Sequence, residues 1–352
     1  MIATRSLSLP VLVTGATGFA GGHLARTLAR RGYVVRALVR PGSRVDALAE
    51  AGVRIVEGQL TNARDVARAS AGVSTIFHIA AAYRTAREPD SYYFDVNVGG
   101  TEHIIEAARR HGVERLVHCS TVGVHGNVEQ APANEDSPFN PGDVYQESKL
   151  LGEQRVAEAV RAGLPAVIAR PAAIYGPGDM RLLKLFRGVQ RGTFRIFGDG
   201  STHYHLVYVD DLVEGFIKCA EVPDAIGQTF ILAGPRCTSL NELVSLVADA
   251  VGVRPPKTRF PLWPLLTAGT ICEGLCRPLR IEPPLHRRRA EFFVKNRAFS
   301  IERARRVLEY NPRVGPREGL ARTAEWYAAR GLLRPVPQRV RIPEPQMQEI
   351  AP

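Results

Sequence analysis

The first half of the chain alternates between short apolar runs and longer segments with helical spacing. Apolar runs predict strands at 11–14, 33–39, 53–57, 73–80, 116–120 and 166–170. Between them, the spacing of apolar residues predicts helices at 21–31, 97–111 and 145–162. This alternation is typical of a parallel sheet covered by helices. It predicts an α/β fold, a Rossmann-type doubly wound parallel sheet.

The pattern loosens after Arg170, where prolines and glycines interrupt it. Short strands at 206–208 and 229–232 are expected to return to the main sheet, and helices are expected at 180–191 and 316–330.

Three regions follow from these elements. We expect a dinucleotide-binding Rossmann domain, a smaller discontinuous C-terminal substrate lobe and a proline-rich extended tail, with the bounds 9–173 plus 206–233, 174–205 plus 234–330, and 331–352.

Composition narrows the class of protein. The 352 residues are 45% hydrophobic and 23% charged, the proportions of a soluble globular protein. The formal net charge of +11 invites a nucleic-acid hypothesis, but the chain carries no nucleic-acid-binding signature, so we expect no nucleic-acid partner. Five widely spread cysteines are typical of a reducing compartment. These features predict a cytoplasmic protein.

The longest uncharged stretch, 260–272, has 13 residues, whereas a membrane span needs about 20. Its apolar side chains, Trp263 among them, fit either core packing of the small lobe or peripheral contact with a membrane, helped by nearby arginines. The sequence leaves both interpretations open.

A glycine loop follows the first predicted strand. Gly15, Gly18 and Gly21 lie between that strand and a helix. In this context glycines allow a tight turn, close approach of a pyrophosphate and close packing of helix on strand. The loop predicts a dinucleotide cofactor.

The end of the second strand bears on which cofactor binds. A carboxylate there would bond the ribose hydroxyls of NAD, whereas an arginine suits the additional phosphate of NADP. The chain offers Arg36 and Arg40. We expect NADP or NAD, with NADP favoured through Arg40.

Tyr145 and Lys149 lie four residues apart, on one face of a helix. The tyrosine has an ordinary pKa near 10, which the lysine ammonium is expected to bring toward the working range. Ser120 and Thr121 end a strand, where their hydroxyls can face the crevice at the sheet's carboxyl edge. Together with the glycine loop, these residues predict hydride-transfer chemistry.

Taken together, these motifs resemble the extended short-chain dehydrogenase/reductases, over about residues 10–330. The matching segments are Thr14–Gly21, His78–Ala81, Asn97–Thr101, Ser120–Thr121, Tyr145–Lys149, Arg170–Gly178 and Val207–Asp211. The resemblance implies Tyr145 as general acid/base, Lys149 as its activator and ribose contact, Thr121 as the carbonyl-orienting hydroxyl, and a supporting role for Asn97. Ser120 is the neighbour that could substitute for Thr121.

The resemblance also implies a set of cofactor contacts: Gly15, Thr17, Gly18, Phe19, Ala20, Gly21, Arg40, Gln59, Leu60, Ala80, Ala81, Lys149 and Pro171. Gln59 departs from the family, which usually has aspartate there.

Further departures narrow the branch. Val122 and Gly123 replace the acidic pair that follows the catalytic threonine of nucleotide-sugar dehydratases. The stretch 202–206 lacks the arginine that pairs with a diphosphate in nucleotide-sugar epimerases. Later segments, including 260–266, are similar to the 3β-hydroxysteroid dehydrogenase-like branch.

We therefore expect an NAD(P)-dependent oxidoreductase that interconverts a secondary alcohol and a ketone on an apolar, sterol- or terpenoid-like substrate. The alternatives are a nucleotide-sugar epimerase with tightly bound NAD and a non-catalytic cofactor sensor. His203 and His205 have no third ligand at suitable spacing, so no metal is expected. The family resemblance implies a homodimer through the helices at 97–111 and 145–162.

Overall fold

The computed structural model describes residues 10–83, 88–256, 258–264, 267 and 292–335. Its largest feature is a seven-stranded sheet in the order β11-β6-β5-β4-β1-β2-β3, with every neighbouring pair parallel. The strands are β1 (Val11–Thr14), β2 (Val35–Val39), β3 (Arg54–Glu57), β4 (Thr75–His78), β5 (Arg115–Cys119), β6 (Ala166–Pro171) and β11 (Thr229–Leu232). The strand order reverses between β1 and β4, which confirms the predicted doubly wound Rossmann fold.

Helices cover both faces of this sheet because alternate side chains of each strand point to opposite faces. Val11 and Val13 of β1 pack in one apolar cluster and Leu12 packs in the other. Helices α1 (Phe19–Arg30) and α8 (Val209–Glu221) pack on the first face, and α3 (Ala63–Ser70), α5 (Gly100–Arg110) and α6 (Val144–Arg161) on the second. Shorter elements are α2 (Asp46–Ala49), α4 (Asp90–Phe94), the π-helix η1 (Asp95–Gly99), the 3₁₀ helices η2 (Val122–His125) and η3 (Pro223–Ala225), and α12 (Glu302–Leu308).

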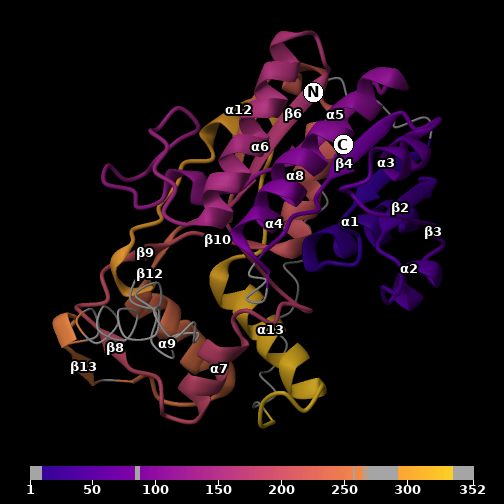
Figure 1. The fold of residues 1–352 in the computed structure, drawn as a ribbon. Coiled ribbons are helices and arrows are strands. Elements are labelled where there is room, and N and C mark those ends of the chain that lie inside the picture. The colour runs from indigo at the N-terminus through magenta and orange to yellow at the C-terminus, as the bar shows by residue number, and fades with distance from the viewer. Residues whose placement is uncertain (1–9, 84–87, 257, 265–266, 268–291, 336–352) are drawn as a thin grey trace, which may run out of the picture.

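A smaller lobe with its own apolar cluster lies below the sheet domain in the view of Figure 1. Phe186, Leu243 and Tyr327 are among its fully or almost fully buried side chains. Its elements are α7 (Leu183–Gln190), β8 (Ile196–Phe197), β9 (His203–Tyr204), β12 (Thr238–Ser239), α9 (Leu240–Val251), β13 (Arg259–Phe260) and α13 (Pro316–Ala329). Both segments assigned to the lobe from sequence therefore contribute to one core.

One strand lies elsewhere than expected. Residues 229–232 join the main sheet, but β10 (Leu206–Tyr208) pairs with β7 (Ala173–Tyr175) in a separate two-stranded sheet, so the expectation for 206–208 was wrong. The separate pairing of β7 and β10 begins where β6 ends. The N–H of Ala172 donates to Leu232, whereas the N–H of Ala173 donates to His205, so the chain changes partners immediately after Pro171.

A buried ion pair ties the sheet to α6. The Arg170 Nε donates to both carboxylate oxygens of Glu153, at 3.2 and 3.1 Å, and both side chains are about 95% buried. Nη1 of Arg170 also donates to the Glu135 carbonyl at 2.8 Å and lies 3.1 Å from Nε2 of His125. The pair therefore connects β6, α6, η2 and the loop at 126–143.

Replacing Glu153 with glutamine should destabilise the fold by about 3–5 kcal/mol, because the substitution leaves the Arg170 charge buried without an anion. Urea unfolding measures the change. Glu158→Gln is the matched control on the same helix: Glu158 pairs with Arg155 but is 52% exposed, so its loss should cost less than about 1 kcal/mol. Equal losses for the two variants would contradict this interpretation.

Candidate active site

The glycine loop lies at the carboxyl edge of β1, immediately before α1. Helix α1 has no side-chain cap at Gly18 and no acidic residue in its first turn. A helix start of this kind offers backbone N–H groups and a positive dipole end to an anion. Thr17 and Gly18 are exposed at this point, as a phosphate-binding loop requires.

Three backbone segments meet in this loop. A Cβ on Gly15, whose φ is +72°, would lie 2.7 Å from the Ala80 backbone, and a Cβ on Gly21 would lie 2.3 Å from the Gly15 carbonyl oxygen. The Ala80 N–H donates to Oγ1 of Thr14 at 3.2 Å. The structure thus brings Gly15, Gly21 and Ala80 together, and this packing holds the uncapped start of α1, which suits a dinucleotide pyrophosphate, next to the loop after β4.

His78, at the end of β4, stabilises this arrangement through two side-chain contacts. Its Nδ1 lies 2.8 Å from Oγ1 of Thr14 and its Nε2 lies 3.1 Å from Oγ1 of Thr101. Burial, followed by the charge of Lys149, lowers the pKa of His78 to about 3. The ring is therefore neutral at neutral pH and serves as a cross-link between β1, β4 and α5.

Tyr145 and Lys149 lie on α6, as predicted. The helix begins at Val144, after Asp143 accepts a hydrogen bond from the N–H of Gln146 at 2.9 Å. Nζ of Lys149 donates to the Cys119 carbonyl at 2.7 Å, and the residue is only 2% exposed. Burial lowers the pKa of Lys149. The ammonium therefore lies beneath the carboxyl end of β5.

The pKa of Tyr145 differs from the expectation. Burial is the main cause that raises it above its ordinary value, with smaller contributions from Cys119 and Tyr83. The positive charge of Arg181 acts in the opposite direction, toward a lower pKa. The protein's own groups therefore hold the phenol protonated.

Ser120 and Thr121 directly follow β5, next to these residues. Oγ1 of Thr121 accepts a hydrogen bond from the N–H of Gly123 at 3.0 Å, an arrangement that leaves the hydroxyl hydrogen to be donated elsewhere. Oγ of Ser120 is buried and has no hydrogen-bond partner among the described residues.

Asn97 is a positioning residue within η1. Its Oδ1 accepts from the N–H of Ala82 at 2.8 Å, and its Nδ2 donates to Oγ of Ser148 at 2.9 Å and to the Ala82 carbonyl at 3.2 Å. A Cβ on Gly152 would lie 2.3 Å from the Asn97 carbonyl oxygen. Asn97 therefore joins the loop after β4 to α6, on the turn that carries Tyr145.

The remaining predicted contacts lie around the glycine loop or farther out. Arg40 is exposed directly after β2. Gln59 is exposed and its N–H donates to Asp65, and the Leu60 carbonyl accepts from Nδ1 of His103. Phe19 and Ala20 begin α1, Ala81 is exposed after β4, and Pro171 is buried at the end of β6.

Two residues near Tyr145 were missed from sequence. The Tyr83 ring packs edge-on against the Tyr145 ring, with centroids 4.9 Å apart. Arg181 interacts electrostatically with Tyr83, and its guanidinium carbon lies 5.8 Å from the centre of the Phe19 ring. Arg181 follows the matched segment Arg170–Gly178 closely, but no local pattern indicates which residues it faces.

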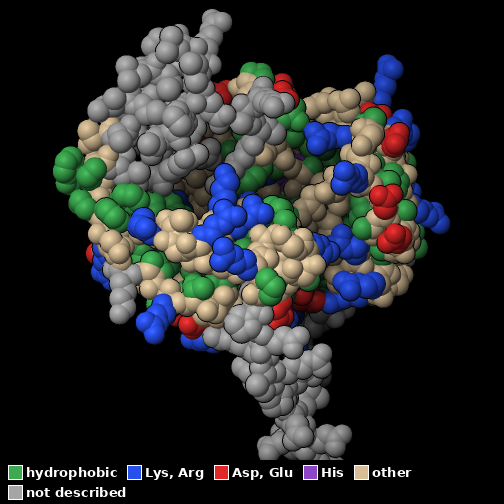
Figure 2. Space-filling model, turned by 90° about the horizontal axis from the view of Figure 1, so that it is seen from below, with side chains coloured by type: hydrophobic (Ala, Val, Ile, Leu, Met, Phe, Trp, Pro, Cys, Tyr) green, Lys and Arg blue, Asp and Glu red, His purple; other side chains and the backbone are tan. Residues whose placement is uncertain are grey.

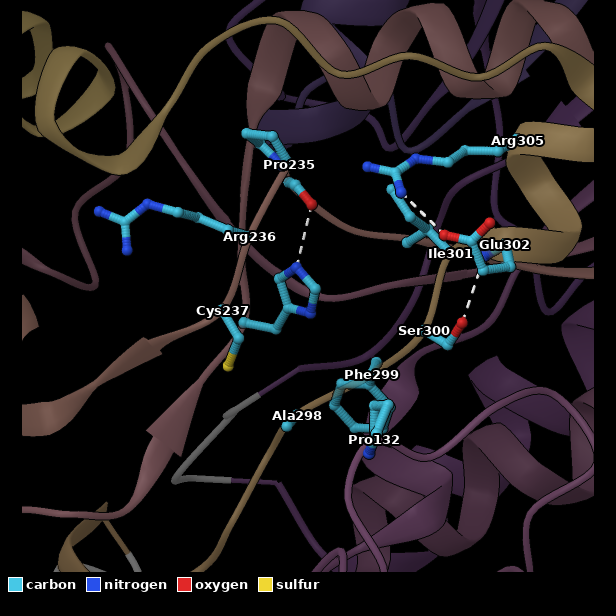
Figure 3. Close-up of a pocket in the computed structure, with 12 residues that line it drawn as sticks. Pro132, Pro235, Arg236, Cys237, Ala298, Phe299, Ser300, Ile301, Glu302 and Arg305 are labelled. Atoms are coloured by element: carbon cyan, nitrogen blue, oxygen red, sulfur yellow. Dashed lines mark hydrogen bonds and ion pairs between the residues drawn. The ribbon is translucent and has the colours of Figure 1, made fainter.

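Figure 3 shows a pocket that is separate from the predicted site residues. Its volume is about 350 Å³, and its lining includes His205, Cys237, Phe299 and Arg305 but none of the predicted site residues. Nε2 of His205 lies 3.0 Å from the Gly234 carbonyl. Within the described part of the chain no three histidine, cysteine or acidic side chains gather as metal ligands do.

The profile of the NAD dependent epimerase/dehydratase family matches residues 11–233. The chain belongs to this family. A 2-alkyl-3-oxoalkanoate reductase from Stenotrophomonas maltophilia is 34% identical over 89% of this chain and 98% of its own length. A decarboxylating sterol-4-alpha-carboxylate 3-dehydrogenase from Schizosaccharomyces pombe is 30% identical over 90% of this chain and 96% of its own.

A solved structure of MoeE5 in complex with UDP-glucose and NAD is 28% identical, with a TM-score of 0.71 over 92% of this chain and all of that one. These findings confirm the predicted family, its sterol-dehydrogenase-like branch and the enzyme class, a dehydrogenase/reductase acting on CH–OH groups.

Gly21→Ala should destabilise the protein by about 1–3 kcal/mol in urea unfolding, because the new methyl group meets the Gly15 carbonyl oxygen and outweighs the gain in helix propensity. Gly99→Ala is the control: it is also a helical glycine, but nothing lies within 4 Å of its Cβ position. That variant should be neutral or more stable by up to about 1 kcal/mol. A neutral Gly21→Ala would show that the loop is not closely packed.

Proposed function

We propose that this protein is an NAD(P)-dependent oxidoreductase that interconverts a secondary alcohol and a ketone on an apolar substrate. The observation that carries the proposal is the placement of Tyr145 and Lys149 one helical turn apart on α6. Both lie beside Cys119 at the carboxyl end of β5, and the Thr121 hydroxyl lies two residues beyond it.

The chemistry follows from the state of each group. The phenol of Tyr145 is protonated, so it can donate a proton to a ketone oxygen during reduction and take it back from the alcohol in the reverse reaction. Thr121 donates a hydrogen bond to the same oxygen. Lys149 stabilises the phenolate that is left. When bound, the nicotinamide supplies or accepts the hydride.

Two observations favour an apolar substrate. Met180 is 52% exposed in the segment that leads from β7 toward α7, next to Arg181. The two curated relatives are named for an alkyl-substituted oxoalkanoate and for a sterol carboxylate, and both names describe a largely apolar molecule. Each name also places a carboxylate on the carbon next to the one that reacts.

Two observations favour the alternative function of a nucleotide-sugar epimerase. The solved neighbour binds UDP-glucose, and the structure brings Arg297 against Tyr204, with Nη1 3.3 Å from the phenol oxygen. A guanidinium thus lies beside the stretch 202–206, where the sequence has none. A panel of 3β-hydroxysteroids, simple ketones and UDP-sugars separates the two functions: net redox turnover supports the oxidoreductase, and sugar interconversion without it supports the epimerase.

Tyr145→Phe should lower kcat by about 100- to 10,000-fold, because the proton donor is lost, while the Kd for cofactor stays unchanged. Steady-state turnover and fluorescence titration of the reduced cofactor measure the two quantities. Tyr33→Phe is the matched control, since Tyr33 bonds to Glu221 before β2. Activity retained by the Tyr145 variant would refute the assignment.

We further propose a preference for NADP through Arg40. Arg40→Asp should lower the ratio of kcat/KM with NADPH to that with NADH by at least about 10-fold, because a charge-assisted pair to the ribose phosphate is lost. Arg54→Asp, at the opposite end of the neighbouring strand β3, should leave the ratio unchanged. An unchanged preference in both variants would exclude this role.

Membrane contact and dimerisation stay predictions. Trp263 is 69% exposed and Phe260 41%, and residues 265–266 and 268–272 of the uncharged stretch lie outside the described residues. Figure 2 shows lysine and arginine side chains grouped beside hydrophobic ones on the face seen from below. Among the described helices, none is long and apolar enough to cross a bilayer. A cytoplasmic, homodimeric enzyme with peripheral membrane contact is our proposal.

A further inference from the structure

Arg181 is held rigidly between β7 and α7. Its Nε donates to Oδ1 of Asp179 at 2.7 Å, and Nη2 donates to the Ile174 carbonyl. The Asp179 carboxylate, itself almost fully buried, also accepts from the backbone N–H groups of Arg181 and Leu182. This positioning limits the side-chain entropy that a ligand would otherwise have to restrict.

The guanidinium lies where three parts of the candidate site converge. It interacts electrostatically with Tyr83, whose ring packs against Tyr145, and it lies 5.8 Å from the ring of Phe19 at the start of α1. Its positive charge also acts on the Tyr145 phenol. Arg181 of the small lobe therefore lies close enough to the proposed proton donor to act on it.

Arg181 has exposed surface and hydrogen-bond donors left with which to bind an anion. The side chain is 35% exposed, although Asp179 beside it is only 2% exposed. A guanidinium carries five N–H donors in a planar fork, and Arg181 uses one on Asp179 and one on the Ile174 carbonyl. Such a fork matches a carboxylate in geometry as well as in charge.

We propose that Arg181 binds a carboxylate that the substrate carries on the carbon next to the reacting one. The substrate class is then 3-hydroxy and 3-oxo carboxylic acids with an apolar body. This inference rests on the proposed function, because it takes the reacting carbon to lie at Tyr145. The carboxylates in the named substrates of the two relatives agree with it.

Binding in a dead-end complex tests the proposal without turnover. Protein saturated with reduced cofactor is titrated calorimetrically with 3-hydroxydecanoate and with its methyl ester, which keeps the chain and hydroxyl but removes the charge. Wild type should bind the acid more tightly than the ester. Arg181→Gln should weaken binding of the acid by about 10- to 100-fold and leave binding of the ester unchanged.

Arg191→Gln is the matched control. It removes one positive charge from the same lobe, at an exposed residue directly after α7, and should alter neither Kd. A wild type that does not prefer the acid, or an Arg181 variant that weakens acid and ester equally, would overturn the proposal. A weaker Kd for the reduced cofactor alone would assign Arg181 to the cofactor phosphates instead.

A different result would contradict the proposed function. That result is the absence of Tyr145-dependent redox turnover of every alcohol and ketone tested, including uncharged 3β-hydroxysteroids. Selective binding of the acid through Arg181 would survive that result as a binding property. Conversely, turnover of steroids or of the ester with no preference for the acid would sustain the oxidoreductase and refute the carboxylate site.

Discussion

The candidate site depends on close backbone packing at the carboxyl edge of the sheet. Gly15 lies against the backbone of Ala80, and Gly21 lies against the backbone of Gly15. Neither position has room for a methyl group. This packing sets the start of α1 against the end of β4, so the positive end of one helix and the Ala80–Ala81 loop face the same space. Cofactor binding requires that arrangement before any catalytic group matters.

A second close approach places the chemistry. Gly152 lets α6 lie against the Asn97 carbonyl, and the Asn97 amide joins the loop after β4 to the turn that holds Tyr145. Directly after Gly152, and about two turns beyond Tyr145, Glu153 is paired with Arg170 of β6. The same helix is therefore anchored by a buried ion pair and presents Tyr145 and Lys149 to the sheet edge, and stability and geometry are coupled.

Electrostatics at the site depend on burial more than on ion pairing. Burial raises the pKa of Tyr145 and lowers those of Lys149 and His78. Burial thus favours the neutral forms of these side chains. The charged form of Lys149 is stabilised by its hydrogen bond to the Cys119 carbonyl. In such surroundings the guanidinium of Arg181, held by Asp179, is the group suited to bind an anionic part of a substrate.

The sequence by itself determined the alternation of strands and helices, the glycine loop, the Tyr145–Lys149 spacing and the family, because each is a local pattern of period, turn or motif. Only the tertiary structure decided that 206–208 pairs with β7, that Lys149 donates to the Cys119 carbonyl, and that Tyr83 and Arg181 lie around Tyr145. These outcomes join residues 30 or more positions apart. They depend on how backbone hydrogen bonds and buried charges are satisfied in the packed molecule, which no local pattern specifies.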